Sequence, residues 1–170
     1  MNQPILYLMA GYPGAGKTTI ASTISKLTGA VHLSSDKTRF ELFDTPAFTE
    51  EEHKKLYQTL DQETQSLLAE GKSVIYDANL NRYQHRAEKY AICDRLGVKA
   101  ILVWVQTPRS LAKERATHES RAHFAPRDET LATMFDRVAG VIEPPREFEN
   151  PIIIDGSNAN PDVVARALSL

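Results

Sequence analysis

One segment of the sequence has glycines, a lysine and a threonine at the spacing of a phosphate-binding loop. Residues 11–18 read Gly-Tyr-Pro-Gly-Ala-Gly-Lys-Thr and satisfy the pattern G-x-x-x-x-G-K-[ST]. Glycines let the backbone curl so that successive amide N–H groups point at phosphate oxygens. The pattern predicts that Lys17 reaches the β- and γ-phosphates of a nucleotide and that the Thr18 hydroxyl binds Mg²⁺. A glycine-rich turn that only joins two elements is the alternative interpretation.

The residues on both sides of this loop supply the context that the motif needs. Ile5–Ala10 is an apolar run typical of a strand, and Lys17–Leu27 has apolar residues at helical spacing. The amino terminus of such a helix carries a partial positive charge that favours an anion. We therefore predict a nucleotide-binding loop, although Thr19 is better placed to pack or cap locally. The loop residues expected at the nucleotide are Gly11, Pro13, Gly14, Ala15, Gly16, Lys17, Thr18 and Thr19.

An acidic and a basic residue follow the second predicted strand and could act on a second substrate. Asp36 comes soon after Val31–Leu33, at the end of the strand where open α/β sheets bind ligands, and a helix would place Arg39 on the same face. An aspartate beside an acceptor hydroxyl can accept its proton, and an arginine can hold the acceptor or a developing charge. The same spacing is equally consistent with Asp36 capping a short helix and Arg39 pairing with it at the surface.

A second carboxylate ends the third predicted strand. Asp77 closes Ser73–Asp77 and occupies the place at which phosphate-binding folds hold Mg²⁺ with a carboxylate, usually through water. Asn79 is close enough in sequence to contact an acceptor. Asp and Asn are also common turn residues, so a turn at the end of the strand is the alternative.

Together these segments resemble the polynucleotide-kinase-like branch of the P-loop kinases, an AAA-type group that includes 5′-hydroxyl polynucleotide kinases, zeta toxins and chloramphenicol phosphotransferase. The resemblance rests on the Gly-x-Pro-Gly-x-Gly-Lys-Thr loop, on Ser-Asp-Lys-Thr-Arg at residues 35–39 and on Ile-Tyr-Asp-Ala-Asn-Leu at residues 75–80. It covers nearly the whole chain in order. It implies an adenylate-kinase-like fold in which Asp36 is the general base and Arg39 binds the acceptor or its phosphate.

An arginine-rich stretch lies between the fourth and the last predicted strands. In related kinases a helical lid at this position supplies arginines to the ATP phosphates and excludes water when it closes. We expect the lid at about residues 109–140, with Arg115 and Arg121 at the phosphates and Arg121 stabilising the transferred group. Acidic residues are interleaved with these arginines, so a solvated face of mixed charge is the alternative. His118 and His123 lack partners at metal-binding spacing and are expected to be exposed.

The elements that must position these residues alternate between strand and helix. The predicted strands are Ile5–Ala10, Val31–Leu33, Ser73–Asp77, Ala100–Val105 and Ile152–Ile154. The predicted helices are Lys17–Leu27, Asp36–Phe43, one with a Thr49–Glu52 capping box that runs to Gly71, Tyr83–Leu96, Pro108–His118, one capped by Asp128 that ends near Gly140, and one that begins at Asn160-Pro161. This order predicts a doubly wound α/β fold with a parallel five-stranded sheet, in a single domain over residues 1–170.

Composition excludes several classes of protein. The 170 residues are 42% hydrophobic and 25% charged, which fits a globular chain and not a fibrous or disordered one. The lone Cys93 excludes an internal disulfide and a multi-cysteine zinc site; it is expected in a helix core and predicts a reducing compartment, the cytoplasm. No unbroken apolar stretch exceeds six residues, so we expect no membrane span.

The net charge of −2 is the sum of segments of opposite sign. Residues 1–35 carry two lysines and no acid, residues 36–77 sum to −5, and residues 80–149 sum to +2. The acid-free opening suits a bound polyphosphate. The acidic middle segment is expected to flank the acceptor, and it disfavours a polynucleotide, which needs a basic channel lined with aromatic residues.

We therefore predict a kinase that uses ATP and Mg²⁺ to transfer the γ-phosphoryl group to a hydroxyl of a small molecule, such as a nucleoside, sugar or antibiotic. A 5′-hydroxyl nucleic-acid end is the alternative acceptor. A hypothesis from another class is a nucleotide-binding ATPase or switch module, which transfers phosphate only to water and acts on a partner.

Overall fold

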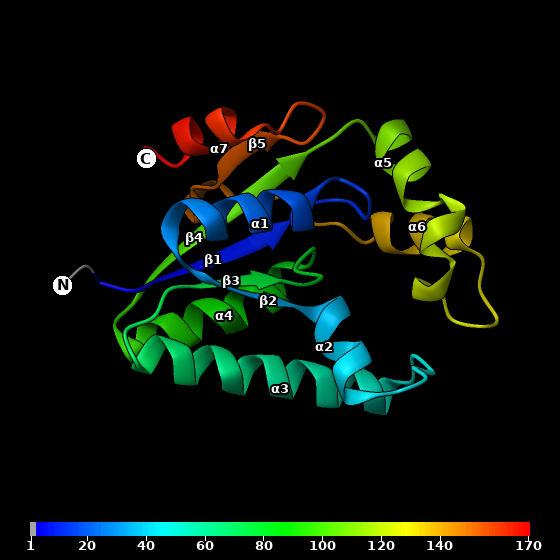
Figure 1. Ribbon diagram of the computed structural model, residues 1–170, viewed down its shortest axis with the longest axis horizontal. Helices are drawn as coiled ribbons and strands as arrows, with labels where there is room; N and C mark the ends of the chain where they lie inside the picture. The colour runs from blue at the N-terminus through cyan, green and yellow to red at the C-terminus, as the bar shows by residue number, and fades with distance from the viewer. Residues whose placement is uncertain (1–2) are drawn as a thin grey trace.

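The computed structural model describes residues 3–170 and has a parallel sheet at its centre (Figure 1). The strand order is β2-β3-β1-β4-β5, and all four neighbouring pairs are parallel. This confirms the predicted five-stranded α/β fold. The strands are β1 (Ile5–Ala10), β2 (Val31–Ser34), β3 (Val74–Asp77), β4 (Lys99–Gln106) and β5 (Ile152–Asp155).

Seven α-helices and two short 3₁₀ helices connect or follow the strands in the described chain. The α-helices are α1 (Lys17–Thr28), α2 (Ser35–Leu42), α3 (Glu50–Ala69), α4 (Tyr83–Leu96), α5 (Arg109–Ala116), α6 (Leu131–Ala139) and α7 (Pro161–Ala167). The 3₁₀ helices are Glu119–Phe124 and Glu147–Glu149.

Two predicted helix starts need correction. Thr49 caps α3 through the Glu52 N–H, but the Glu52 carboxylate accepts from the Ala47 and Phe48 N–H groups, so the predicted capping box is only half formed. Helix α6 is capped by Thr130 instead of Asp128. The reason is a turn from the Pro126 carbonyl to the Glu129 N–H, which includes Asp128 and delays the helix.

The sheet is buried on both faces because alternate residues of its strands point to opposite sides. Leu6 and Leu8 of β1 belong to the core under α3 and α4, whereas Tyr7 and Met9 belong to the core under α1 and α7. Figure 1 shows these two pairs of helices on opposite sides of the sheet. Cys93 is buried in the first core, as predicted.

The segment between β4 and β5 lies beyond the carboxyl ends of the strands. Figure 1 shows α5 and α6 together at the end of the sheet opposite the two termini. This segment has its own small core, made of Ala112, Ala116, Phe135 and Ala139, and Tyr12 of the phosphate loop packs against it. In residues 3–170, no helix combines the length and apolar character needed to cross a membrane.

Candidate active site

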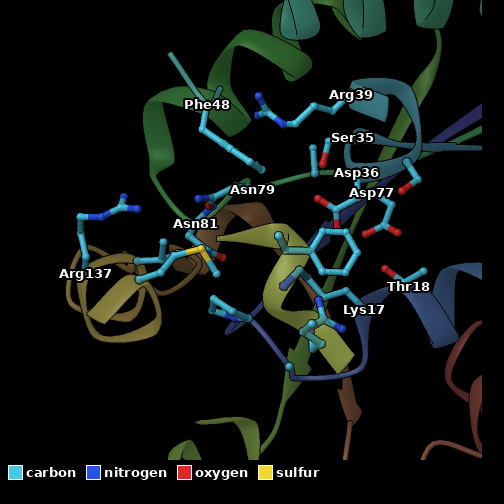
Figure 2. A pocket seen from close by; sticks show the side chains of 18 of the residues that line it. Lys17, Thr18, Ser35, Asp36, Arg39, Phe48, Asp77, Asn79, Asn81 and Arg137 are labelled. Carbon is cyan, nitrogen blue, oxygen red and sulfur yellow. The ribbon is translucent and has the colours of Figure 1, made fainter. Parts of the chain in front are cut away.

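A large cavity of about 1240 Å³ lies at the carboxyl ends of the strands (Figure 2). Parallel strands bring the loops after β1, β2 and β3 to this edge, and the α5–α6 segment closes the far side. Most predicted site residues line the cavity: Pro13, Gly14, Gly16, Lys17, Thr18, Thr19, Asp36, Arg39, Asp77, Asn79, Arg115 and Arg121.

The predicted phosphate loop joins β1 to α1 and forms one wall of the cavity. Gly16 caps α1 in a left-handed conformation, with φ 103°, and Thr18 is exposed to the cavity. Lys17 Nζ donates to the carbonyls of Gly11 and Tyr12 at 2.9 and 2.8 Å. Burial lowers the pKa of Lys17 to about 8, although nearby carboxylates oppose the shift. The loop therefore holds a cation against its own backbone, beside the exposed Thr18.

Two predicted loop residues do not line the cavity. The Gly11 N–H donates to the Asn81 side-chain oxygen at 3.1 Å. The Ala15 N–H donates to the Tyr12 carbonyl, and the Ala15 carbonyl accepts from the Thr107 hydroxyl. Both residues shape the loop from behind, and their amides are already in use.

Asp36 lies in the first turn of α2 and is free of a capping role. Ser34 caps that helix through the Lys37 N–H, which removes the reading of Asp36 as a cap. The Asp36 carboxylate faces the cavity near Lys17 (Figure 2). Desolvation by the cavity walls raises its pKa, and the Asp77 carboxylate raises it further against the opposing effects of Arg121 and Lys17. A carboxylate with a raised pKa in a cleft is suited to accept a proton.

Asp77 ends β3 as a nearly buried carboxylate, only 5% exposed. Its Oδ2 lies 2.9 Å from Nε2 of His32 on the adjacent strand β2. The asparagines that follow have two functions: Asn79 lines the cavity and accepts the Asn81 N–H, and Asn81 accepts the Gly11 N–H. The segment is thus both a turn and a part of the cavity wall.

The oxygen donors beside the loop fit Mg²⁺. Thr18 and Asp77 line the same cavity, and His32 contacts only one oxygen of Asp77, which leaves Oδ1 for a bound ion or its water. Mg²⁺ is commonly held by one or two carboxylates together with substrate phosphates. Among residues 3–170, no group of three or more His, Cys, Asp or Glu side chains could hold a metal ion.

Arg39 is buried in the wall next to Asp36, not paired at the surface. It is 5% exposed and donates from Nη2 to His53 Nδ1 at 2.8 Å. The centroid of the Phe48 ring lies 4.9 Å from the guanidinium carbon of Arg39. Phe48 has a left-handed backbone with φ 57°, a strained conformation for an aromatic residue, and its N–H donates to Glu52 at 2.7 Å.

The arginines after β4 have different positions. Arg121 lines the cavity, lies close enough to influence Asp36 and Lys17, and packs over Phe124. Arg115 lines the cavity and donates to the Gly156 carbonyl at 3.0 Å. Arg109 instead pairs with Asp136 and is exposed, in agreement with a place at the start of the helix.

The charge of residues 36–77 does not describe the cavity. Of the ten acids in that segment, only Asp36 and Asp77 line it. Around the whole cavity, basic side chains outnumber acidic ones: Lys17, Arg39, Arg115, Arg121 and Arg137 against Asp36, Asp77, Asp128 and Glu129. The charge of that segment, which disfavoured a polynucleotide acceptor, is therefore not the charge of the cavity.

Comparison with protein families decides the affiliation of the chain. A family model described as an AAA domain matches residues 6–145, which include the phosphate loop, Asp36, Asp77 and the α5–α6 segment. The chain belongs to this family. A search of curated proteins finds no match to this AAA domain.

Solved structures share the fold of this AAA domain. A sugar kinase from Janibacter sp. HTCC2649 is 18% identical, with a TM-score of 0.68 over 99% of this chain and 94% of that one. A gluconokinase from Sinorhizobium meliloti 1021 is 15% identical, with a TM-score of 0.68 over 98% and 90%. An APS kinase from Mycobacterium tuberculosis, in complex with AMPPNP and APS, is 16% identical, with a TM-score of 0.65 over 99% and 96%. The chain thus has the P-loop kinase fold that its sequence resembles.

Among the residues lining the cavity of this AAA domain that sequence reasoning missed, four make contacts that shape the site. His53, Phe48, Asn81 and Arg137 belong to no local motif, and each reaches the site through a contact between distant segments. Arg137 of α6 also makes two hydrogen bonds with Glu129. Only Asn81 had a signal, since it follows the Asp-x-Asn-Leu turn directly.

Proposed function

We propose that this AAA domain is an ATP-dependent kinase that transfers the γ-phosphoryl group to a hydroxyl of a small molecule. The observation that carries the proposal is the cavity shared by the phosphate loop and Asp36, a carboxylate of raised pKa beside Lys17. A loop that binds phosphates needs such a second group for transfer, because the acceptor must be oriented or deprotonated. The fold shared with a sugar kinase, a gluconokinase and an APS kinase supports it.

In this proposal each side chain has one role. The loop amides, Lys17 and the arginines Arg115 and Arg121 hold the phosphates, while Thr18 and Asp77 hold Mg²⁺. The ion, when bound, offsets negative charge on the phosphate oxygens. Arg39 and Asn79 position the acceptor.

Asp36 accepts the proton of the acceptor hydroxyl while the oxygen of that hydroxyl forms a bond to the γ-phosphorus. The bond from that phosphorus to the β–γ bridging oxygen breaks, and ADP leaves. The α5–α6 segment acts as a lid that excludes water from this step.

A reducing, cytoplasmic setting is part of the proposal and is supported by the single buried thiol.

The test is transfer of label from [γ-³²P]ATP to four acceptor classes: neutral sugars and nucleosides, sugar acids, sugar phosphates, and 5′-hydroxyl oligonucleotides. We expect labelling of a small hydroxylated molecule that requires Mg²⁺ and is lost on substitution of Asp36. Labelling of oligonucleotides alone would indicate the nucleic-acid alternative. Release of phosphate to water that no acceptor stimulates would indicate an ATPase or switch.

A matched pair of glycine substitutions tests the phosphate loop. Gly14 and Gly29 both have φ 75°, so alanine at either costs about 1–2 kcal/mol of stability. A Cβ at Gly14 would also lie 2.2 Å from the Ala112 carbonyl of α5, whereas at Gly29 nothing is within 4 Å. We expect Gly14→Ala to weaken AMPPNP binding in calorimetry by roughly tenfold or more. The reason is the clash with Ala112, since a clash that costs the bound state about 1.4 kcal/mol lowers the affinity tenfold. Equal AMPPNP affinity in the two variants would contradict nucleotide binding at this loop.

A further inference from the structure

Arg39 carries a buried charge that no carboxylate neutralises through a hydrogen bond. Its Nη2 donates to His53, and its Nη1 is buried without a hydrogen-bond partner among the described residues. The closest carboxylate oxygen, on Glu52, is 3.9 Å from Nη1. Both oxygens of Glu52 already accept N–H groups of Ala47 and Phe48. The fold therefore encloses the guanidinium and leaves Nη1 without a hydrogen bond, with Glu52 at ion-pair distance but already bonded to the backbone.

The partner that fixes Arg39 is a neutral imidazole. A guanidinium can only donate, so Nδ1 of His53 must accept, and the His53 ring carries its proton on Nε2. Partial burial lowers the pKa of His53, and the charges of Arg39 and Arg137 lower it further against a small opposing effect of Glu52. His53 thus orients Arg39 without cancelling its charge.

The surroundings show where that charge acts. Arg39, His53 and Arg137 all line the main cavity, and Arg137 is also hydrogen-bonded there to Glu129. Figure 2 shows Arg39 and Arg137 approaching from different elements, with Phe48 and Asn79 between them in this view. Both arginines are close enough to His53 to influence it. A buried donor without a hydrogen bond destabilises the charged form, and a bound anion that accepts from it removes that penalty.

We propose that His53 is a positioning residue that makes the site select an acceptor with an anionic group. The group, a carboxylate or a phosphate, binds at the Arg39–His53–Arg137 end of the cavity, and the acceptor hydroxyl lies at Asp36. A carboxylate at position 53 in place of the imidazole neutralises Arg39 and abolishes the preference. This inference rests on the proposed kinase function, because it concerns the acceptor of that same cavity.

Two substitutions of His53 separate its charge from its hydrogen bond. His53→Gln keeps a neutral acceptor for Arg39, while His53→Glu supplies a carboxylate that pairs with it. Gln58→Glu is the matched control, since it adds the same single charge on an exposed position of α3. The probe is inorganic phosphate, titrated by calorimetry into protein saturated with Mg²⁺ and AMPPNP so that the phosphate loop is already filled.

We expect one phosphate ion to bind the wild type, His53→Gln and Gln58→Glu with similar affinity. The affinity of His53→Glu for phosphate is expected to be about tenfold or more lower, since a charge-assisted hydrogen bond contributes about 1.5–3 kcal/mol. Steady-state kinetics on a neutral sugar, its sugar acid and its sugar phosphate show which anion the site takes. In these assays His53→Glu raises KM for the anionic acceptor by a larger factor than it lowers kcat.

Three results overturn the inference: no phosphate bound beside AMPPNP, equal phosphate affinity in His53→Glu and the wild type, or equal losses in His53→Gln and His53→Glu. The last would show that only the shape of the imidazole matters. Failure of the proposed function is distinguishable, because there Mg²⁺–AMPPNP itself does not bind or no acceptor is labelled. Thermal melting of each variant separates a loss of phosphate binding from a loss of folding.

Discussion

Asp36→Asn is expected to lower kcat for phosphoryl transfer by about 10²–10⁴-fold while AMPPNP affinity changes by about twofold at most. The amide has nearly the same shape as the carboxylate but cannot accept the hydroxyl proton. The substitution leaves the capping of α2 intact, because Ser34 and not Asp36 provides the cap. The measurement is kcat on the acceptor that the labelling screen identifies, with AMPPNP affinity by calorimetry.

The pKa of Asp36 also sets the sign of two pH effects. A base works only when ionised, so activity falls as the pH drops through the raised pKa of Asp36, at a higher pH than for an ordinary aspartate. For stability, a carboxyl whose pKa is raised by folding stabilises the fold when protonated, and that contribution is lost as the pH rises through the folded pKa. At neutral pH Asp36→Asn therefore keeps or raises Tm although it removes activity.

The control for this substitution is Glu41→Gln on the same helix. Glu41 is exposed and makes only a long surface pair with Lys37 at 3.8 Å, so its loss changes net charge by the same amount without touching the cavity. We expect Glu41→Gln to keep kcat. Asp36 would not be the base if Asp36→Asn kept full transfer to the acceptor. The same would follow if the residual activity of Asp36→Asn fell at low pH just as wild-type activity does.

The fold followed from the sequence because its signals are local. Each strand is a short apolar run, and the left-handed glycines Gly29 and Gly97 cap α1 and α4 within two residues of the predicted ends at Leu27 and Leu96. The predicted helix caps fail where other local hydrogen bonds compete, as at Glu52, whose carboxylate accepts from the backbone of Ala47 and Phe48 instead of Thr49.

The site was only partly predictable for the same physical reason. The phosphate loop, Asp36 and Asp77 stand at strand ends, so topology alone brings them together. The wall around Arg39 depends on side chains of α3 and α6 that meet only after the chain folds, and no periodicity encodes those contacts. Charge summed over a segment also mixes residues that face the cavity with residues that face water.

Glu149→Ala is expected to destabilise the protein by about 3–5 kcal/mol, which lowers Tm by roughly 6–20 °C. The side chains of Glu149 and Arg86 are both fully buried, and the two carboxylate oxygens accept from Arg86 Nε and Nη2 at 2.7 and 3.0 Å. Removal of Glu149 leaves a buried guanidinium without its counter-ion. Glu147→Ala is the matched control, because Glu147 belongs to the same 3₁₀ helix and is exposed.

The stability lost in Glu149→Ala depends on pH with a definite sign. Burial alone would raise the pKa of Glu149, but hydrogen bonds from Arg86, the Arg146 N–H and the Tyr90 hydroxyl hold it below its usual range. A carboxyl with a lowered pKa stabilises the fold above its unfolded pKa and loses that contribution as the pH falls through the folded pKa. The difference in Tm between the wild type and Glu149→Ala therefore narrows in acid.

The same substitution is expected to weaken AMPPNP binding although Glu149 does not line the cavity. Arg86 Nη1 also donates to the carbonyls of Leu80 and Glu143, and the Glu143 N–H donates to the Asn81 carbonyl at 2.7 Å. The Asn81 side chain in turn accepts the Gly11 N–H where the phosphate loop begins.

A double replacement, Arg86→Met with Glu149→Leu, removes both charges and is expected to recover part of the lost stability, since apolar residues of similar size often substitute for a buried pair. It does not restore the hydrogen bonds to Leu80 and Glu143, so AMPPNP affinity stays low. Full affinity in the double variant would show that the loop is held independently of Arg86. A loss in Glu149→Ala no greater than in Glu147→Ala would show that the buried pair contributes little to either property.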